Sequence, residues 1–380
     1  MQNIADPLEL RVHTSQLLGK EQDLVLHGGG NTSLKIDDIL YVKGSGWDLA
    51  SIQKEGFSPA QTNKLLELLR YDTLSDSDMV KYQREALVDQ KAPNPSVEAI
   101  LHTLIPYKFV DHTHADAIVT ISNSINGEAI IDELFGDSYL IIPYVMPGFI
   151  LAKVVEEMTK GVEWDRLDGI ILHNHGVFTF DNDAMLSYNK MLATVAKADN
   201  YLKKYKEKIE TLIDIPSTPK NYDIDTLTEV LTKAKGYKVT LSTNRTPLAY
   251  YFASQDDSTL YTKGVLTPEH IIRTKRFPAV VDGDYESGIR EFESYYRDYF
   301  GRYSNTEIML NPSPNWIVLR GYGIVAIGKN QKEANIIEDI VMHTIKAILY
   351  GEALGGYMSI NESDSFAMEY WELEQNKLKG

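Results

Sequence analysis

Short apolar runs with the alternation of β-strands recur along the first half of the chain, at residues 39–43, 109–114 and 170–180. Segments with the apolar spacing of amphipathic helices lie among them, at residues 61–69, 97–104, 129–134, 149–160 and 185–208. Strands that alternate with helices form a sheet covered by helices. The pattern therefore predicts an α/β or α+β layer fold.

The second half of the chain repeats short sequence segments of the first half in the same order. Residues 40–44 (LYVKG) are echoed by 260–264 (LYTKG), residues 98–103 by 269–274, and residues 170–177 by 317–324. Short sequences typical of strands and helices can recur by chance, but three similar segments in the same order favour a duplicated domain. Arg273 then stands where the first copy has His102, and Tyr322 where it has His175. The second copy is therefore expected to be a degenerate repeat.

The boundary between the two copies is expected in residues 214–221. This segment holds Pro216 and Pro219 among polar turn formers and follows the long helical pattern. Two prolines so close together end a helix and favour a linker. We therefore expect a first domain over residues 1–215, and a second α/β domain over residues 223–380 that lacks the chemistry of the first.

Charge excludes some functions. The 380 residues include 38 lysines and arginines against 54 aspartates and glutamates, a formal net charge of −16. Such a chain is a poor ligand for nucleic acid or an anionic membrane. Cysteine is absent, so disulfides, thiolate metal sites and cysteine nucleophiles are excluded, and any metal is left to histidine and carboxylate.

The composition along the chain also predicts its compartment. The first residues include Asp6 and Glu9 and lack a signal-peptide pattern, and the most apolar stretch, residues 139–155, is interrupted by prolines and Lys153. We expect a cytoplasmic protein without a membrane span.

Two pairs of histidines stand out as candidate metal ligands. His112 and His114 lie two apart at the end of a strand-like run, where side chains two apart point to the same face. His173 and His175 end another apolar run, and Gly176 after them permits close approach of a backbone or substrate. Either pair alone is more often a polar strand end. Together they predict a catalytic three-histidine site, with His175 as the third ligand and His173 as the alternative.

Glu98 is the candidate acid or base. It lies at a helix start that Ser96 can cap, in the expected first turn, on the same face as His102. Stabilisation of the helix dipole is a competing explanation of almost equal merit. A carboxylate beside a metal is, however, suited to proton transfer.

Two glycine-rich loops are suited to holding an anion. Residues 27–33 (HGGGNTS) and 43–46 (KGSG) offer backbone N–H groups and side-chain donors, with Lys35 or Lys43 close by. Ser96 adds a hydroxyl at a helix start. Two tight turns are the plain alternative. Neither loop is a dinucleotide or P-loop motif, so no nucleotide is implied.

Taken together, these motifs resemble the class II aldolase/adducin family. The sequences GGNTS at 29–33, KGSG at 43–46, Pro-Ser-x-Glu at 95–98, His-Thr-His at 112–114 and Asn-His-Gly at 174–176 follow the order of that family. The later residues 264–273 and 365–374 are similar to the aldolase portion of bifunctional rhamnulose-1-phosphate aldolase/short-chain dehydrogenase proteins. The chain ends where their dehydrogenase is expected to begin.

The resemblance implies a three-layer α/β/α sandwich, assembled as a dimer or tetramer, followed by the degenerate aldolase-like domain. It implies a zinc ion, replaceable by manganese, cobalt or iron, on His112, His114 and His175, with Glu98 as the catalytic acid/base. It also implies a substrate phosphate held by Gly30, Asn31, Ser45, Gly46 and Ser96. Val97 departs from the family's usual second serine. The stretch comparable to the one that holds the family's tyrosine proton donor, residues 130–134, has no tyrosine; Glu133 and Tyr139 are possible substitutes, and neither is assigned that role.

The implied function is that of a class II aldehyde-lyase acting on a small phosphorylated sugar. It would cleave a ketose 1-phosphate, similar to rhamnulose 1-phosphate, into dihydroxyacetone phosphate and an aldehyde through a metal-bound enediolate. Sugar-phosphate epimerases and decarboxylases of the same family, and a non-catalytic adducin-like interaction module, are the alternatives.

Overall fold

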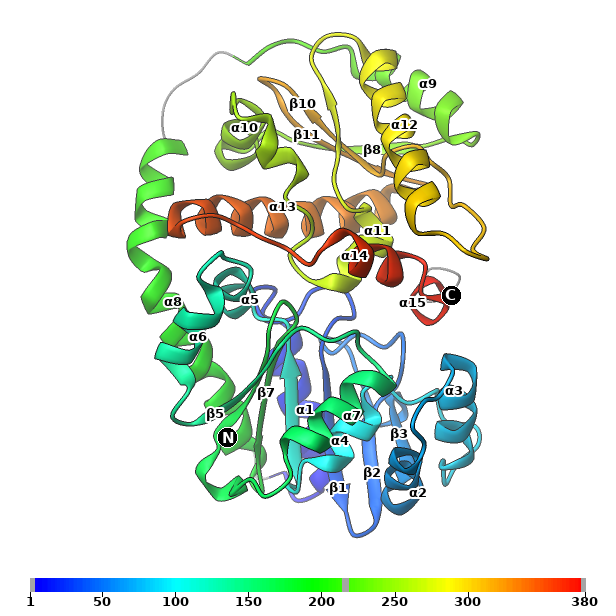
Figure 1. Cartoon of the computed structure of the whole chain (residues 1–380), viewed down its shortest axis with the longest axis vertical. Coiled ribbons are helices and arrows are strands. Elements are labelled where there is room, and N and C mark those ends of the chain that lie inside the picture. Colours follow the sequence, from blue (N-terminus) through cyan, green and yellow to red (C-terminus); the bar gives the residue numbers. More distant parts are fainter. Residues whose placement is uncertain (1–3, 214–218, 377–380) are drawn as a thin grey trace. The chain divides into compact units, whose positions relative to one another are not determined.

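A computed structural model describes residues 4–213 and 219–376 and divides them into two compact units (Figure 1). The first holds residues 4–122 and 128–200, and the second holds residues 123–127 and 201–375 apart from the gap. This division falls inside a long helix, whereas the expected linker is residues 214–221, of which 214–218 lie outside the described residues. Within the described ranges, no helix combines the length and apolarity needed to cross a membrane.

The first unit is built on a seven-stranded sheet. In spatial order the strands are β3 (Phe57–Gln61), β2 (Ile39–Lys43), β1 (Asn31–Ile36), β4 (Phe109–Thr113), β7 (Gly176–Asp181), β6 (Gly169–Leu172) and β5 (Tyr139–Ile142). β5 runs parallel to β6, and the other neighbouring strands are antiparallel.

Helices cover both faces of this sheet. Phe109 packs against Leu34 and Ala184, on the face that carries α1 (Pro7–Gly19) and α8 (Ala184–Ile213). Val110, the next residue of β4, packs with Leu101 of α4 (Ala99–Leu104) and Leu151 of α7 (Phe149–Met158) on the opposite face. Figure 1 shows α4 and α7 side by side over the strands. The expected α/β/α arrangement is confirmed.

The remaining elements of this half are short. They are the helices α2 (Thr62–Glu67), α3 (Asp76–Glu85), α5 (Asp116–Ser122) and α6 (Gly127–Phe135), and the 3-10 helices η1 (Lys54–Gly56), η2 (Leu68–Arg70) and η3 (Trp164–Arg166).

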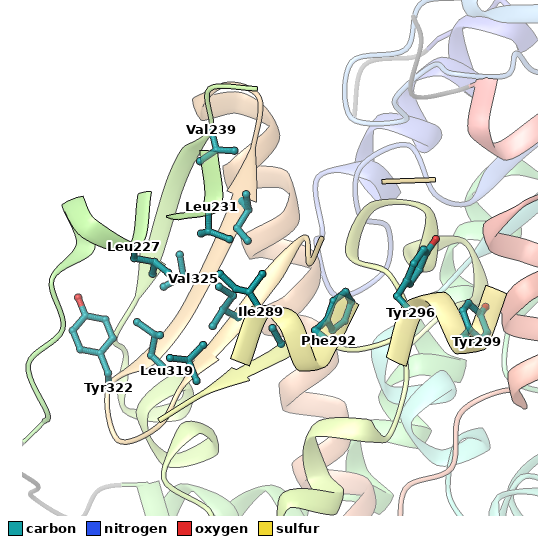
Figure 2. Close-up of a cluster of buried hydrophobic side chains, with 14 of the residues drawn as sticks. Leu227, Leu231, Val239, Ile289, Phe292, Tyr296, Tyr299, Leu319, Tyr322 and Val325 are labelled. Carbon is teal, nitrogen blue, oxygen red and sulfur yellow. The ribbon is translucent and has the colours of Figure 1, made fainter. Parts of the chain in front are cut away.

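The second unit has a four-stranded sheet with the order β8 (Thr240–Asn244), β11 (Gly323–Gly328), β10 (Trp316–Leu319) and β9 (Ala279–Val281). One face packs on α9 (Ile224–Lys235) and α12 (Tyr285–Tyr303), where Leu227, Leu231 and Ile289 meet Leu319 and Val325 (Figure 2). The other face packs on α13 (Gln331–Leu354) and α10 (Pro247–Ala253).

Short segments complete this unit. They are α11 (Ile271–Thr274), α14 (Glu362–Glu369), η4 (Ser258–Thr262) and η5 (Pro268–His270), with α15 (Glu372–Asn376) at the end of the described chain.

The second sheet repeats four strands of the first in order and direction. β8-β11-β10-β9 matches β4-β7-β6-β5, with one parallel pair in the same place and the other pairs antiparallel. The registers also agree, because Leu172 pairs with Gly176 in one hairpin and Leu319 with Gly323 in the other. The expected second aldolase-like α/β domain is therefore confirmed at the level of topology.

Two of the three equivalences predicted from the sequence repeats are wrong. Residues 260–264 fall on η4 and the turn after it rather than on a counterpart of β2, and residues 269–274 fall on η5 and α11, which follow β8. The helix that precedes β8 as α4 precedes β4 is α9. The echo of residues 170–177 in 317–324 agrees with the hairpin registers. Short sequence matches between the two halves of the chain therefore do not by themselves identify equivalent structural elements.

Strand and helix predictions succeed where the local pattern is strong. β2 has the predicted bounds, whereas residues 170–180 form two strands with a turn at His173 to His175 instead of one. β1 was missed because its first residues, Asn31 to Ser33, read as part of a glycine-rich turn.

Candidate metal centre

β4 supplies two of the candidate ligands. Its alternation places His112 on the face of Val110, while Asp111 points to the opposite face and binds Arg11. His112 is fully buried and His114 half-buried just beyond the strand end. The Nε2 atoms of these two imidazoles are 3.0 Å apart.

The turn between β6 and β7 supplies the third candidate. Asn174 has a left-handed φ of 56°, and the backbone N–H of His175 donates to the carbonyl of Leu172. Because β7 pairs with β4, this tight turn lies next to the end of the strand that carries His112 and His114. Ligand atoms of His112, His114 and His175 all lie within 4.8 Å of one another. His173, the alternative, does not belong to this group.

Glu98 faces the same cluster. Its Oε2 lies 3.5 Å from Nε2 of His112, and its Oε1 lies 3.6 Å from Nε2 of His175. The carboxylate is 5% exposed, and Oε1 has no hydrogen-bond partner among the described residues. The helix begins at Ala99, so Glu98 precedes the first turn that it was expected to occupy. Ser96 accepts a hydrogen bond from the Glu98 backbone N–H, and the Glu98 side chain, at the N-cap position, makes no capping hydrogen bond to the helix.

Hydrogen bonding fixes which nitrogen of His112 faces the cluster. Its Nδ1 lies 3.1 Å from the carbonyl of Val177, which can only accept, so Nδ1 carries the proton and Nε2 keeps its lone pair. Burial lowers the pKa of His112 well below its usual value, although the charge of Glu98 opposes the shift. His112 is therefore neutral at neutral pH.

Glu98 is ionised in this site. Burial by itself would raise its pKa, but the hydrogen bond from Asn31 and the positive charge that the imidazoles of the cluster carry when protonated oppose it, and the pKa is lowered. A buried carboxylate is balanced by a positive charge, which a proton on the imidazole cluster or a bound cation can supply.

The donor set fits a divalent transition metal. Tetrahedral ligand nitrogens at the usual distance of about 2.0–2.1 Å from zinc are themselves a little over 3 Å apart, close to the separation of the His112 and His114 Nε2 atoms. Oε1 of Glu98, which has no hydrogen-bond partner in the described part of the chain, lies 3.6 Å from Nε2 of His175 in the same group. Imidazole with carboxylate suits zinc, manganese, cobalt and iron, and does not distinguish them.

The loops expected to hold phosphate are tied together. The Ser45 backbone N–H donates to Asn94 and the Ser96 N–H donates to Lys43, which joins the loop of residues 43–46 to the start of α4. Nζ of Lys43 binds the carbonyl of Gly28 at 3.1 Å and so joins the glycine-rich loop to both.

Individual residues of these loops differ in what surrounds them. Ser45 and Gly46 are exposed, Ser96 is buried, and an added Cβ at Gly30 would lie 2.6 Å from the carbonyl oxygen of His112. The side chain of Asn31 is directed to Glu98, with Nδ2 2.6 Å from Oε2.

Two other candidates lie outside this group. Lys35 points away from the loops and donates to the carbonyls of Ile105 and Tyr107. The hydroxyl of Tyr139 binds Thr194 of α8, on the sheet face opposite His112. Burial raises the pKa of Tyr139 to about 12.

The second unit has other residue types at the ligand positions. By strand register Thr243 corresponds to His112, Arg245 to His114 and Tyr322 to His175. The Arg245 guanidinium lies over the Tyr322 ring, 4.4 Å from its centroid. A cation–π pair therefore stands where the first unit has two imidazoles.

Comparison with known proteins shows which protein families this chain matches. The model of the Class II Aldolase and Adducin N-terminal domain matches residues 9–202, and that of the aldolase class II second domain matches residues 222–378. A relative from Bacillus subtilis (strain 168), named uncharacterized oxidoreductase YuxG, is 29% identical over 401 residues. The alignment covers 98% of this chain and 58% of that protein, so the chain spans little more than half the length of this relative.

Solved structures were matched as well. The N-terminal class II aldolase domain of a conserved protein from Thermoplasma acidophilum is 35% identical, with 53% of this chain and 96% of that chain covered and a TM-score of 0.49. L-fuculose-1-phosphate aldolase from Thermus thermophilus is 15% identical, with 52% and 97% covered and a TM-score of 0.35. The family match over residues 9–202 takes in every strand of the sheet that carries the histidine cluster, and by that match the chain belongs to the class II aldolase/adducin family.

Proposed function

We propose that this chain is a metal-dependent lyase that cleaves a ketose 1-phosphate, similar to rhamnulose 1-phosphate, into dihydroxyacetone phosphate and an aldehyde. The observation that carries the proposal is the convergence of His112, His114 and His175 with the buried, ionised Glu98. Membership of the family supports the reaction class. The sugar substrate rests on the motif resemblance and is the finer part of the proposal.

The three imidazoles would hold a divalent cation, zinc in the first instance. Bound there, such a cation supplies Lewis-acid polarisation of a substrate carbonyl and its neighbouring hydroxyl. His112 is prepared for this role because Val177 fixes its tautomer, and His175 because the tight turn at Asn174 presents it.

Glu98 would move the proton. Its Oε2 is held by Asn31, while Oε1 is free of hydrogen bonds within the described residues and directed to the cluster. An ionised carboxylate oxygen in that position can accept a proton from the substrate carbon or hydroxyl at the reacting bond and return it to the product.

The tied loops would anchor the phosphate. Gly30, Gly46 and the hydroxyls of Ser45 and Ser96 belong to the loops that Lys43 joins, whereas the backbone N–H groups of Ser45 and Ser96 hold the loops to each other. Because the chain carries a net charge of −16, an anionic substrate depends on such local donors and not on the overall field. Fixing the phosphate holds the reacting bond beside Glu98. We further propose that the chain works in the cytoplasm as a homo-oligomer, a dimer or tetramer.

The test measures metal and product together. Purified wild type and His112→Ala are compared for bound metal per chain and for dihydroxyacetone phosphate released from a panel of ketose 1-phosphates. About one metal per chain, with both metal and activity lost in the variant, supports the lyase. Metal with epimerised or decarboxylated sugar phosphate instead would replace it with those activities. No metal in either protein would leave a non-catalytic module.

A further inference from the structure

A series of buried side chains in hydrogen-bond contact ends at the carboxylate of Glu98, beside the candidate metal centre. The Oγ of Ser33 lies 2.8 Å from Nδ1 of His102, and Nε2 of His102 contacts Oδ1 of Asn31. Nδ2 of Asn31 in turn lies 2.6 Å from Oε2 of Glu98. All four side chains are buried. The chemistry of these groups allows one direction of donation along the series.

The direction follows from the orientation of the Asn31 amide. Its Nδ2 faces Oε2 of Glu98 and its Oδ1 faces Nε2 of His102, and an amide nitrogen donates whereas an amide oxygen accepts. His102 must then carry its proton on Nε2, which leaves Nδ1 to accept from the Ser33 hydroxyl. Burial lowers the pKa of His102 to about 3, which agrees with a neutral ring in a single tautomer.

We infer that His102 is a positioning residue that fixes the amide orientation of Asn31 and, through it, the carboxylate of Glu98. The N–H of His102 prevents the amide from flipping its oxygen toward Oε2. Glu98 is thereby held by one oxygen, and the other stays directed at the imidazole cluster. The inference rests on the proposed function only in giving Glu98 a role at the cation site, and it assigns the side chain of Asn31 to Glu98 and not to a phosphate.

Packing keeps His102 in this position. Its ring meets the edge of Phe178, with 5.4 Å between centroids and an interplanar angle of 66°. The same Phe178 stacks on His112, with 4.0 Å between centroids and an angle of 13°. Phe178 therefore contacts both the positioning imidazole and a candidate ligand, so the ring of His102 has little freedom to turn away.

The first experiment measures Co²⁺ affinity by absorption spectroscopy. His102→Leu removes the donor and is expected to weaken Co²⁺ binding about 10-fold, because a Glu98 carboxylate that is no longer held beside the imidazoles balances the charge of the cation less well. His102→Gln keeps an N–H at similar reach and is expected to restore most of the affinity. Thr103→Val is the matched control, because this buried neighbour on α4 bonds the carbonyl of Ala99. It should bind like wild type.

Coupling separates positioning from general damage to the fold. Asn31→Leu is combined with His102→Leu in a double variant. The double variant is expected to bind Co²⁺ no more weakly than the weaker-binding of the two single variants, because both substitutions break the same series of hydrogen bonds. Additive losses, or equal losses in His102→Gln and His102→Leu, would overturn the inference. So would wild-type affinity in His102→Leu.

A second readout needs neither metal nor activity. In ¹⁵N spectra of the metal-free protein, His102, assigned by its loss in His102→Gln, should carry its proton on Nε2, and Asn31→Leu should weaken that preference. A proton on Nδ1 in the wild type would contradict the inference. If the wild type binds Co²⁺ and releases no dihydroxyacetone phosphate, the lyase proposal fails while the positioning role is still decided by these measurements.

Discussion

Arg11 and Asp111 form a fully buried ion pair on the face of β4 opposite His112, with 2.5 Å between Nη2 and Oδ1. The guanidinium also bonds Thr14 and Ser15, and the second carboxylate oxygen accepts from Ser187 of α8. The pair therefore ties α1 and α8 to the strand that presents the candidate ligands.

Removing one partner of this pair should be severe. Arg11→Met would leave the Asp111 carboxylate buried and unpaired, which costs about 3–5 kcal/mol of unfolding free energy. Urea unfolding of the first unit, followed by circular dichroism, measures the loss. Lys54→Met is the control, because Lys54 pairs with Asp6 at the surface, and its loss should change little. A small effect of Arg11→Met would show that α1 does not depend on the pair.

The candidate ligands could be predicted from sequence because their geometry is local. His112 lies in β4 and His114 follows two positions later, one residue beyond the strand end, and the turn that presents His175 follows an apolar run. The contacts that hold the elements of the site together are, in contrast, between residues far apart in the sequence. Asp111 meets Arg11 from 100 positions away, and Asn31 meets Glu98 across 67. Such pairs are set by strand order, which a single sequence does not reveal.

The position of Glu98 shows a second limit. The residue types around Ser96 predict a helix start, but the exact first turn depends on how α4 packs between β2 and α7. At the N-cap position the Glu98 carboxylate lies 3.5 Å from His112 and 3.6 Å from His175. The duplication was detected through the hairpin of residues 317–324, whereas the ligand counterparts Thr243 and Arg245 follow only from strand register.

His175 and His173 should differ in their effect on metal binding. His175→Ala removes a member of the cluster and is expected to reduce bound metal per chain to a small fraction of the wild-type value. His173→Ala, two residues away in the same turn, should leave the metal content near that of wild type, because His173 lies outside the cluster. Elemental analysis of both variants decides. Metal loss in His173→Ala alone would reverse the assignment.

Gly30 is required by the closeness of its loop to β4. It has a φ of +59°, and an added Cβ would lie 2.6 Å from the carbonyl oxygen of His112. Gly161 has a φ of +76° with no atom within 4 Å of an added Cβ among the described residues. Gly161→Ala should therefore cost about 1 kcal/mol for backbone strain alone.

Gly30→Ala adds a steric clash to that strain. We expect a further loss of about 1–3 kcal/mol and weaker metal binding, because the clash displaces the backbone of His112. Thermal unfolding and Co²⁺ titration of the two variants measure both effects. Equal stability of the two variants would mean that the loop moves aside without disturbing β4.

Lys235 should make stability rise with pH. Its Nζ is buried and donates to the carbonyl of Ser313 and to Oδ1 of Asn315, and burial, with help from the charge of Lys275, lowers its pKa to about 7. Unfolding returns the pKa to the ordinary value near 10.5. Between these values the unfolded chain holds a proton that the folded chain has lost. The contribution of Lys235 to unfolding free energy therefore increases from about pH 7 toward pH 10, by at most about 1.4 kcal/mol per unit.

The variant Lys235→Met removes this contribution. Its stability relative to wild type should fall as pH rises from 7 to 10, and should show no such trend below pH 7, where both states of the wild type keep the proton. Urea unfolding at several pH values measures the difference, with the exposed Lys233→Met on the same helix as control. Parallel pH curves for wild type and Lys235→Met would show that Lys235 stays charged in the folded unit, its ammonium satisfied by the two oxygens it contacts.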